Sequence, residues 1–293
     1  MSAANDNRNR VIAVHDISCV GRCSLTVALP ILSAAGIETS VIPTAVLSTH
    51  TGEFSGYTFR DLTDDIIPIC EHWKSLGIGA NSIYTGYLGS FHQLKIVEKL
   101  ISDFKDEKTF VLVDPVMGDA GKLYSRIDEK FVSGMRRLCS MADMVVPNIT
   151  EAALLTDSEY VGHGYTKEYI EDLLKKLSLL GPRYCVLSGT SFENGKNGCA
   201  AYDRETGEFS YYFSDHVEGF YYGTGDVFAS ALLGAKLCGK AVSEAIKIAV
   251  DFTTGAINRT YKAGTDKRYG VHFEEELPKY MKALGKLDEG AEK

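Results

Sequence analysis

Residues 109–119 read Thr-Phe-Val-Leu-Val-Asp-Pro-Val-Met-Gly-Asp, an apolar run that stops at an Asp-Pro pair. A second apolar run, Met144-Val145-Val146, stops in a similar way at Pro147-Asn148. Continuous apolar runs of this length are typical of strands that are buried on both faces of a parallel sheet. The two segments therefore predict an α/β protein in which polar residues follow directly after the strands.

The same alternation extends to both sides of these runs. Further strands are predicted from β-branched runs at 11–14, 39–44, 82–84 and 183–187, and helices from apolar periodicity at 24–35, 61–76, 91–104, 226–238 and 243–259. Residues 199–203 and 208–213 alternate around a polar turn, which predicts an antiparallel hairpin. The βαβα order predicts right-handed crossovers, and hence three αβα layers around a mostly parallel sheet with a small antiparallel addition.

Length and composition predict one domain over residues 1–293, with an ordered core of about 10–284 and a polar tail at each end. The chain has 45% hydrophobic and 24% charged residues, the ordinary balance of a globular protein, and contains no linker, repeat or low-complexity tract. Its formal net charge of -8 argues against nucleic acid as a partner, because phosphates require a basic face.

The cysteines and the N-terminus predict a cytoplasmic protein. Seven cysteines are scattered without a Cys-x-x-Cys pair, which is typical of reduced thiols. Residues 1–10 are polar and unlike a signal peptide, and no run approaches the ~20 apolar residues that cross a bilayer. We therefore expect no membrane partner.

Polar residues follow each predicted strand, and open α/β sheets bind ligands at the carboxyl ends of their strands. The candidates are Asp16, Thr51, Tyr87, Asp114, Asp119, Asn148, Glu151 and Ser188. A purely structural alternative exists for some: Asn148 and Glu151 have the spacing of a helix capping box, and Asp16 and Asp114 suit turns. Several carboxylates at one sheet edge nevertheless repel one another unless cations hold them.

Gly223-Thr224-Gly225-Asp226 is the sharpest motif in the chain. A glycine-rich helix start turns backbone N–H groups toward a ligand, and the helix dipole adds partial positive charge, so the segment predicts an anion hole for a phosphoryl group. The alternative is a glycine turn with Asp226 as an ordinary first-turn acid. Beside the strand-end carboxylates, the kinase interpretation is favoured. Because a helix N-terminus stabilises a carboxylate, we expect Asp226 to be a weak base whose position matters more than its basicity.

Other phosphate-binding motifs are missing. No Gly-x-Gly-x-x-Gly follows the first strand, which argues against a dinucleotide-binding oxidoreductase. The stretch from Gly189 to Asn197 differs from a P-loop in its glycine spacing and in the residue after Lys196.

Four blocks together resemble the ribokinase-like superfamily, and more narrowly its pyridoxal (vitamin B6) kinases. They are 86–90 (Gly-Tyr-Leu-Gly-Ser), 114–119 (Asp-Pro-Val-Met-Gly-Asp), Pro147-Asn148 with Glu151, and 223–228 (Gly-Thr-Gly-Asp-Val-Phe). Residues 47–52, Leu-Ser-Thr-His-Thr-Gly, also point to the B6 branch, and the likeness covers about residues 10–260. It implies ATP-dependent phosphorylation of the 5′-hydroxymethyl group of pyridoxal, pyridoxine or pyridoxamine, by an enzyme that is usually a homodimer.

The resemblance also implies a role for each matching residue. Asp226 would be the catalytic base, and Gly223, Thr224 and Gly225 would donate amides to the phosphoryl charge. Asp114, Asp119 and Glu151 would hold Mg²⁺, largely through water, with a monovalent cation such as K⁺ also possible. The predicted ATP contacts are Asp114, Asn148, Glu151, Ser188, Gly223, Thr224 and Gly225, with Val217 and Phe220 near the adenine. The predicted substrate contacts are Asp16, Leu47, Thr51, Tyr87 and Asp226.

Some features depart from the pattern and leave alternatives open. The family commonly has Ser near the Asp16 position, so either Asp16 or Ser18 could contact the pyridine ring. Ser188 stands where many members have a longer polar or basic residue. No cysteine is close to Gly223 in the sequence, which favours a B6 kinase over a hydroxymethylpyrimidine kinase. The alternatives are that sibling activity and a catalytically silent binding protein on the same fold.

Overall fold

The central feature is a nine-stranded sheet in the order β11-β10-β9-β8-β5-β4-β1-β2-β3. The computed structural model describes residues 9–125 and 127–287. Neighbours from β2 to β9 pair in parallel. These strands are β1 (Arg10–Ser18), β2 (Glu38–Leu47), β4 (Ser82–Thr85), β5 (Phe110–Val113), β8 (Met144–Val145) and β9 (Tyr184–Thr190). β3 (Phe59–Asp61) at one edge, and β10 (Lys196–Asp203) and β11 (Glu208–Asp215) at the other, are antiparallel.

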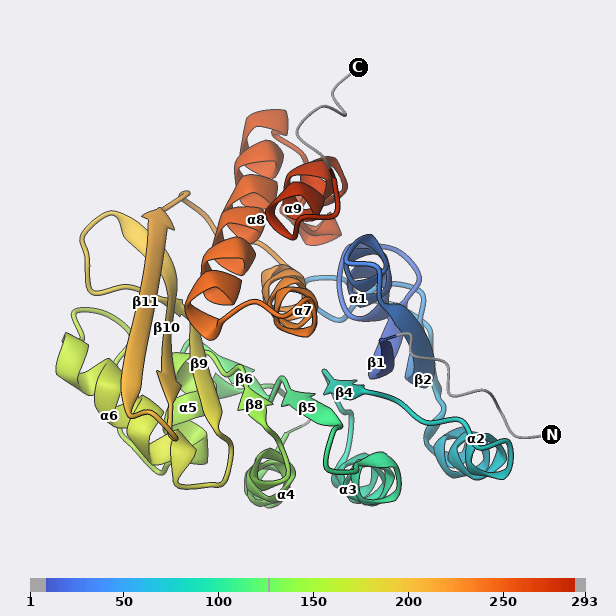
Figure 1. Ribbon diagram of the computed structural model, residues 1–293. Coiled ribbons are helices and arrows are strands. Elements are labelled where there is room, and N and C mark those ends of the chain that lie inside the picture. The colour runs from blue at the N-terminus through green and yellow to red at the C-terminus, as the bar shows by residue number, and fades with distance from the viewer. Residues whose placement is uncertain (1–8, 126, 288–293) are drawn as a thin grey trace.

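Helices cover both faces of this sheet, as Figure 1 shows. One layer contains α1 (Leu25–Ala34), α7 (Thr224–Leu237), α8 (Val242–Ala263) and α9 (Leu277–Ala283). The other contains α2 (Thr63–Ser75), α3 (Phe91–Phe104), α4 (Glu129–Ser140), α5 (Ile149–Leu155) and α6 (Lys167–Ser178). Side chains of one strand alternate between the layers, so Val11 belongs to the first core cluster and Ile12 to the second. The predicted αβα fold class is confirmed.

The predicted elements lie close to their observed positions, but several short strands and some helices were not predicted. β3 has three residues, and β6 (Gly118–Asp119) and β7 (Lys122–Leu123) have two each, too few for a recognisable period of two. Helices α4, α6 and α9 and the 3₁₀ turns η1 (Lys267–Tyr269) and η2 (Glu274–Glu276) were also not assigned from the sequence, and α5 was indicated only by the capping-box spacing of Asn148 and Glu151. The predicted polar tails fall partly on residues 1–8 and 288–293, outside the described residues.

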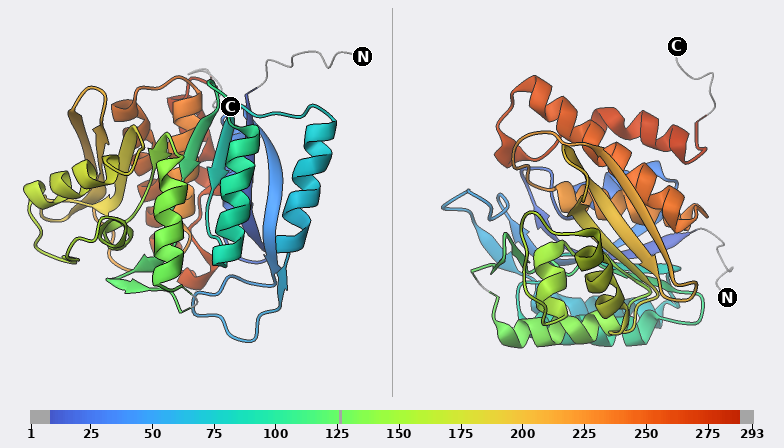
Figure 2. Two further views of the ribbon diagram at one scale, coloured as in Figure 1. Left: turned by 90° about the horizontal axis from the view of Figure 1, so that it is seen from below. Right: turned by 90° about the vertical axis from the view of Figure 1, so that its left-hand side faces the viewer.

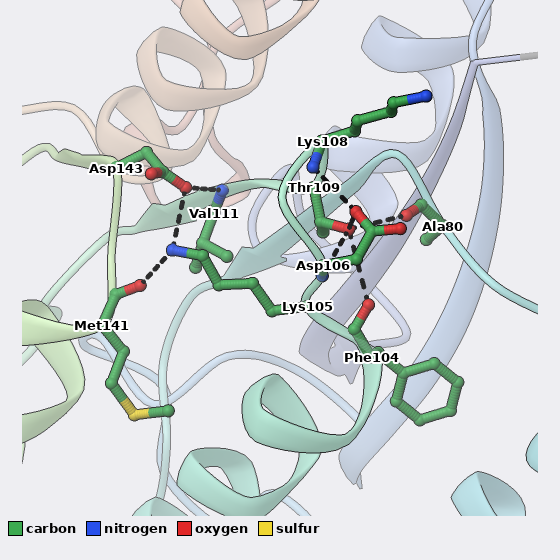
Figure 3. A network of polar contacts seen from close by, with 9 residues as sticks. All are labelled: Ala80, Phe104, Lys105, Asp106, Lys108, Thr109, Val111, Met141 and Asp143. Carbon is green, nitrogen blue, oxygen red and sulfur yellow. Dashed lines mark hydrogen bonds and ion pairs between the residues drawn. The ribbon is translucent and has the colours of Figure 1, made fainter.

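The amino ends of β5 and β8 are joined by a network around Asp143, drawn in Figure 3. The Asp143 carboxylate accepts hydrogen bonds from the Val111 N–H (2.8 Å) and from Lys105 Nζ (3.2 Å). Lys105 Nζ also donates to the Met141 carbonyl at 2.8 Å. This network fixes the amino ends of two core strands, at the opposite end of the sheet from the carboxyl ends.

We expect Asp143→Ala to lower the free energy of unfolding by about 1–3 kcal/mol, because it leaves the Val111 N–H and the Lys105 ammonium without their shared acceptor. Urea denaturation measures this loss. Lys99→Ala is the matched control, since it breaks only an ion pair with Asp103 at the surface, where solvent screens the attraction. Equal stability of the two variants would contradict the structural role of Asp143.

Candidate active site

A cleft of about 810 Å³ lies at the carboxyl ends of the parallel strands. In the left panel of Figure 2, the loop 48–58 (blue) and the β6–β7 hairpin (green) lie at the same end of the molecule. The cleft brings together all but one of the predicted site residues: Asp16, Leu47, Thr51, Tyr87, Asp114, Asp119, Asn148, Glu151, Ser188, Phe220, Gly223, Thr224, Gly225 and Asp226.

Val217 is the exception and corrects one predicted adenine contact. It does not line the cleft but packs, half-buried, against the core cluster under α8. The sequence indicated the right segment, but not which of its side chains turns toward the core. The α8 helix does line the cleft, through Val250, Thr253, Thr254 and Ile257.

The start of α7 has the backbone arrangement that the predicted anion hole requires. The helix begins at Thr224, two residues earlier than predicted, and Gly223 caps it with a φ of 74°. The first N–H groups of a helix have no intrahelical acceptor, so those of Thr224, Gly225 and Asp226 are available to a ligand. Gly223 is required sterically, because a Cβ at this position would lie 1.9 Å from the Arg22 carbonyl oxygen. The glycine thus allows the anion hole to lie against the start of α1.

Ser24 joins two of the cleft carboxylates. Its backbone N–H donates to Asp226 Oδ2 at 2.8 Å, and its hydroxyl donates to Asp16 Oδ1 at 2.7 Å. Ser24 stands at the N-cap of α1, where a serine hydroxyl ordinarily binds the first helical turn, but here no such bond forms. Its φ of 52° is unusual for a residue with a side chain. The local conformation therefore serves the two carboxylates and not the helix.

The pKa of Asp226 corrects the expectation of a weak base. Burial raises it from the ordinary value of 3.8 to about 7, and the nearby Asp16 carboxylate adds to the rise. The Ser24 N–H opposes this rise but does not cancel it. Asp226 is half-buried at the wall of the cleft. The surrounding protein atoms therefore raise its pKa although the residue is not fully enclosed. Near neutral pH Asp226 can both accept and release a proton.

Asp114 is a buried carboxylate at the centre of the acidic set. It is buried, and among the described residues no donor pairs with its side-chain oxygens. Burial raises its pKa well above the ordinary value, with further contributions from Glu151 and Asp226. In all, five carboxylates line the cleft (Asp16, Asp114, Asp119, Glu151 and Asp226), and none of the described lining residues is Lys or Arg. Such a cleft fits a bound cation.

Asn148 and Glu151 form the predicted capping box of α5. Glu151 also accepts the Met117 N–H at 3.0 Å, and Asn148 Nδ2 donates to the Gly118 carbonyl at 2.9 Å. Burial nevertheless raises the pKa of Glu151 to about 8. The start of α5 thus fixes the segment that carries Asp119 into the cleft. Among residues 9–125 and 127–287, no three His, Cys, Asp or Glu side chains are arranged to ligate one metal ion directly, and the water-mediated Mg²⁺ site stays a prediction.

The loop 48–58 lines one side of the cleft, and His50 holds it in place. The Nδ1 atom of His50 accepts the Gly52 N–H at 3.0 Å, and its Nε2 contacts the Arg268 carbonyl oxygen. The His50 ring also packs against Phe54 and Tyr222, with centroids 5.0 and 5.1 Å away. Both ring nitrogens are therefore engaged with backbone groups, which fixes the orientation of the ring. Sequence reasoning placed His50 at a strand end but could not assign it this role.

A cysteine does lie near the anion hole, contrary to what its sequence distance suggested. Cys23 lines the cleft, and its Cα would be 3.5 Å from a Cβ on Gly223. Burial raises the pKa of its thiol to about 12, with a further contribution from Asp226. Distance along the chain failed here because α1 and α7 pack side by side. Cys23 is a buried neutral thiol, and all seven cysteines of the chain are free.

Sequence reasoning missed several lining residues. Ser24, Tyr57, Phe59, Tyr124, Thr150 and Tyr222 line the cleft, as do the α8 residues. No motif marks them. Ser24 is the most important of these, and the Arg-Cys-Ser sequence gives no sign of its positive φ.

The mostly parallel αβα sheet, the carboxylate-lined cleft at its carboxyl edge and the glycine-capped helix start together define a small-molecule kinase of the ribokinase-like fold. The sequence profile of the phosphomethylpyrimidine kinase family matches residues 32–271. This chain therefore belongs to that family.

The chain covers most of the length of its curated relatives and of similar solved structures. A Bacteroides thetaiotaomicron protein, provisionally described as a phosphomethylpyrimidine kinase and crystallised with pyridoxal, is 37% identical, with a TM-score of 0.88 over 93% of this chain and 96% of that one. The pyridoxal kinase of Lactobacillus plantarum is 29% identical, with a TM-score of 0.86 over 94% and 97%. A pyridoxine/pyridoxal/pyridoxamine kinase of Bordetella avium is 25% identical over 84% of each chain.

Proposed function

We propose that this protein transfers the γ-phosphoryl group of ATP to the 5′-hydroxymethyl group of pyridoxal, pyridoxine or pyridoxamine. The observation that carries the proposal is the position of Asp226, which lies in the first turn of α7 with its carboxylate in the same cleft as the free N–H groups of that turn. A proton acceptor and an anion hole thus share one helix end. The B6 substrates are supported by the relatives named as pyridoxal kinases.

Asp226 accepts the proton of the substrate hydroxyl as its oxygen bonds to the γ-phosphorus and the bond from that phosphorus to ADP breaks. A pKa of about 7 suits this role at neutral pH. The N–H groups of Thr224 and Gly225 stabilise the charge on the transferring oxygens. Because such transfers pass through a loose transition state, alignment of the hydroxyl contributes as much as its deprotonation.

Asp114, Asp119 and Glu151 would hold Mg²⁺, largely through water, and Glu151 also orients the segment that carries Asp119. The ion would offset the charge of the β- and γ-phosphate oxygens. The described lining residues include no Lys or Arg that could do so. Asn148 and Ser188 would lie along the triphosphate. The adenine would lie between Phe220 and the α8 residues.

Asp114→Asn is expected to raise the Mg²⁺ concentration needed for half-maximal activity by roughly 10- to 100-fold, as losses in metal coordination commonly do. Turnover measured against free Mg²⁺ at saturating ATP tests this. Chelation with EDTA should abolish turnover of the unaltered enzyme. An unchanged Mg²⁺ requirement in the variant would remove Asp114 from the metal site.

A hydroxymethylpyrimidine kinase is the second candidate, because the matching family is described by a phosphomethylpyrimidine kinase activity. An ADP-release assay over pyridoxal, pyridoxine, pyridoxamine and hydroxymethylpyrimidine separates the two. Highest kcat/KM with a B6 vitamer supports the proposal, and highest kcat/KM with hydroxymethylpyrimidine overturns it. Turnover of none of the four would favour a silent binding protein.

The remaining assignments concern the setting of the enzyme: one domain over residues 1–293, a homodimer, a cytoplasmic location and possible activation by K⁺. Free thiols support the location. No helix in the described part of the chain is long and apolar enough to cross a membrane. Sedimentation of the purified protein tests the dimer.

A further inference from the structure

Asp16 is a buried carboxylate that, among the described residues, accepts side-chain hydrogen bonds only from neutral groups. Its relative exposure is 5%, yet it lines the cleft. The Ser24 hydroxyl donates to Oδ1 at 2.7 Å and the Ser18 hydroxyl to Oδ2 at 3.2 Å, and both partners are neutral. A buried carboxylate with only neutral donors is costly unless a positive group joins it.

The described lining residues of the cleft include no Lys or Arg and one histidine, His50. His50 Nδ1 accepts the Gly52 N–H at 3.0 Å, and Nε2 contacts the Arg268 carbonyl oxygen. Both ring nitrogens are thus engaged with the backbone and not with Asp16, so a hydrogen bond from a positively charged group to Asp16 is left for a ligand.

The hydrogen bond from Ser24 to Asp16 requires an unfavourable conformation of Ser24. Ser24 gives up its helix-capping bond and adopts a positive φ while it binds Asp16. Local strain of this kind persists where the site uses it. Ser24 also donates its backbone N–H to Asp226. A single residue therefore connects Asp16 to the carboxylate that is proposed to face the reacting hydroxyl. Asp16 and Asp226 line the same cleft, so a ligand bound to Asp226 has Asp16 as a neighbouring group.

We propose that Asp16 determines substrate specificity by binding a positively charged N–H group of the substrate. This proposal rests on the proposed function. It means that the enzyme selects its substrate by charge as well as by shape. Two groups of a B6 vitamer have this chemistry. One is the protonated ring nitrogen, common to all three vitamers as 3-hydroxypyridines, and the other is the aminomethyl ammonium, present only in pyridoxamine. Hydroxymethylpyrimidine, whose ring is largely neutral at pH 8, lacks both.

The test compares the unaltered enzyme with Asp16→Asn, which keeps the size of the side chain and its acceptor oxygen but removes the charge. kcat/KM is measured at pH 8 for pyridoxine, pyridoxamine and hydroxymethylpyrimidine, and the affinity of each without ATP by calorimetry. We expect a loss of roughly 10- to 100-fold for the cationic ligands, mostly in KM, as for the loss of a charged hydrogen bond. Asp172→Asn, an exposed carboxylate on α6, is the control.

The ligands separate the two sources of charge. Equal losses for pyridoxine and pyridoxamine assign the ring nitrogen, and a loss for pyridoxamine alone assigns the ammonium. Either supports the proposal. An unchanged variant, or an equal loss for hydroxymethylpyrimidine, overturns it. The Tm without ligand distinguishes a structural role: a specificity carboxylate predicts an equal or higher Tm in Asp16→Asn, and a clear fall contradicts it.

This outcome is separable from failure of the proposed function. If the unaltered enzyme phosphorylates no B6 vitamer, the proposed function fails, and the calorimetric arm still decides on Asp16. Binding of pyridoxamine that weakens in Asp16→Asn supports the charge contact, and absence of binding to the unaltered protein overturns it.

Discussion

Replacing Asp226 with Asn is expected to reduce kcat by a factor on the order of 10² or more while leaving ATP affinity nearly unchanged. Asn keeps the size of the side chain and an oxygen for the Ser24 N–H, but it cannot accept the proton of the substrate hydroxyl. The free N–H groups at the start of α7 stay in place, so the phosphates keep their contacts. The loss therefore falls on the chemical step.

The same substitution should change stability in a direction that depends on pH. Below the ordinary pKa of 3.8 the carboxyl is protonated in both the folded and the unfolded chain. Between 3.8 and about 7 the unfolded chain releases this proton while the folded protein retains it, so the wild type loses stability as the pH rises. Asn carries no titrating proton. The Tm of Asp226→Asn relative to the wild type is thus expected to increase from pH 4 to pH 8.

Single-turnover kinetics, calorimetric titration with ATP and thermal melts at several pH values measure these three effects. For the wild type, kcat/KM should rise with pH and level off above about 7, and this limb should be missing from the residual activity of the variant. Asp172→Asn provides the control for a carboxylate-to-amide change at the surface. Near-normal turnover of Asp226→Asn would exclude Asp226 as the proton acceptor.

The features that the sequence could predict are those encoded by many neighbouring residues. The long apolar runs at 109–113 and 183–187 and the helical periodicity of 91–104 are averages over many residues, so the layers and the sheet were predictable. The strand-end carboxylates were predictable as a set because parallel strands end at one edge. Tertiary packing sets the remaining features. The contact of Ser24 with both Asp16 and Asp226 joins residues 202 positions apart, and no local pattern encodes it.

The pKa of Asp226 shows the same limit in the electrostatics. The helix N-terminus is a local feature and predicts a stabilised carboxylate. Burial and the neighbouring Asp16 are tertiary features and act in the opposite direction. Asn148 is the reverse case: its spacing to Glu151 is local, and the predicted capping box is present. Sequence-based predictions are therefore reliable for helix caps and for the periodicity of helices and strands. They are weak for the pKa values of groups that are far apart in the chain but share one cavity.

Gly223→Ala is expected to have the second large effect, on activity and stability together. The new Cβ would lie 1.9 Å from the Arg22 carbonyl oxygen, and the backbone would be held at a φ of 74°. The positive φ costs about 1–2 kcal/mol for Ala, and relief of the clash must move either Arg22 or the start of α7. A shift of about 1 Å at a reacting centre lowers rates by about 10²-fold. We therefore expect kcat/KM to fall by at least this factor.

Gly239→Ala is the matched control, because Gly239 has a φ of 84° at the other end of α7 but no atom within 4 Å of the added Cβ. It should share the cost of the positive φ, about 1–2 kcal/mol in the free energy of unfolding, and leave kcat/KM unchanged. Urea denaturation and steady-state kinetics of both variants separate strain from displacement of the anion hole. If Gly223→Ala lost stability but kept its activity, the N–H groups at the start of α7 would not bind the transferring phosphoryl group. A loss of activity in Gly223→Ala alone would mean that the close contact with Arg22, which joins the anion hole to the loop that carries Ser24, sets the geometry of the reaction.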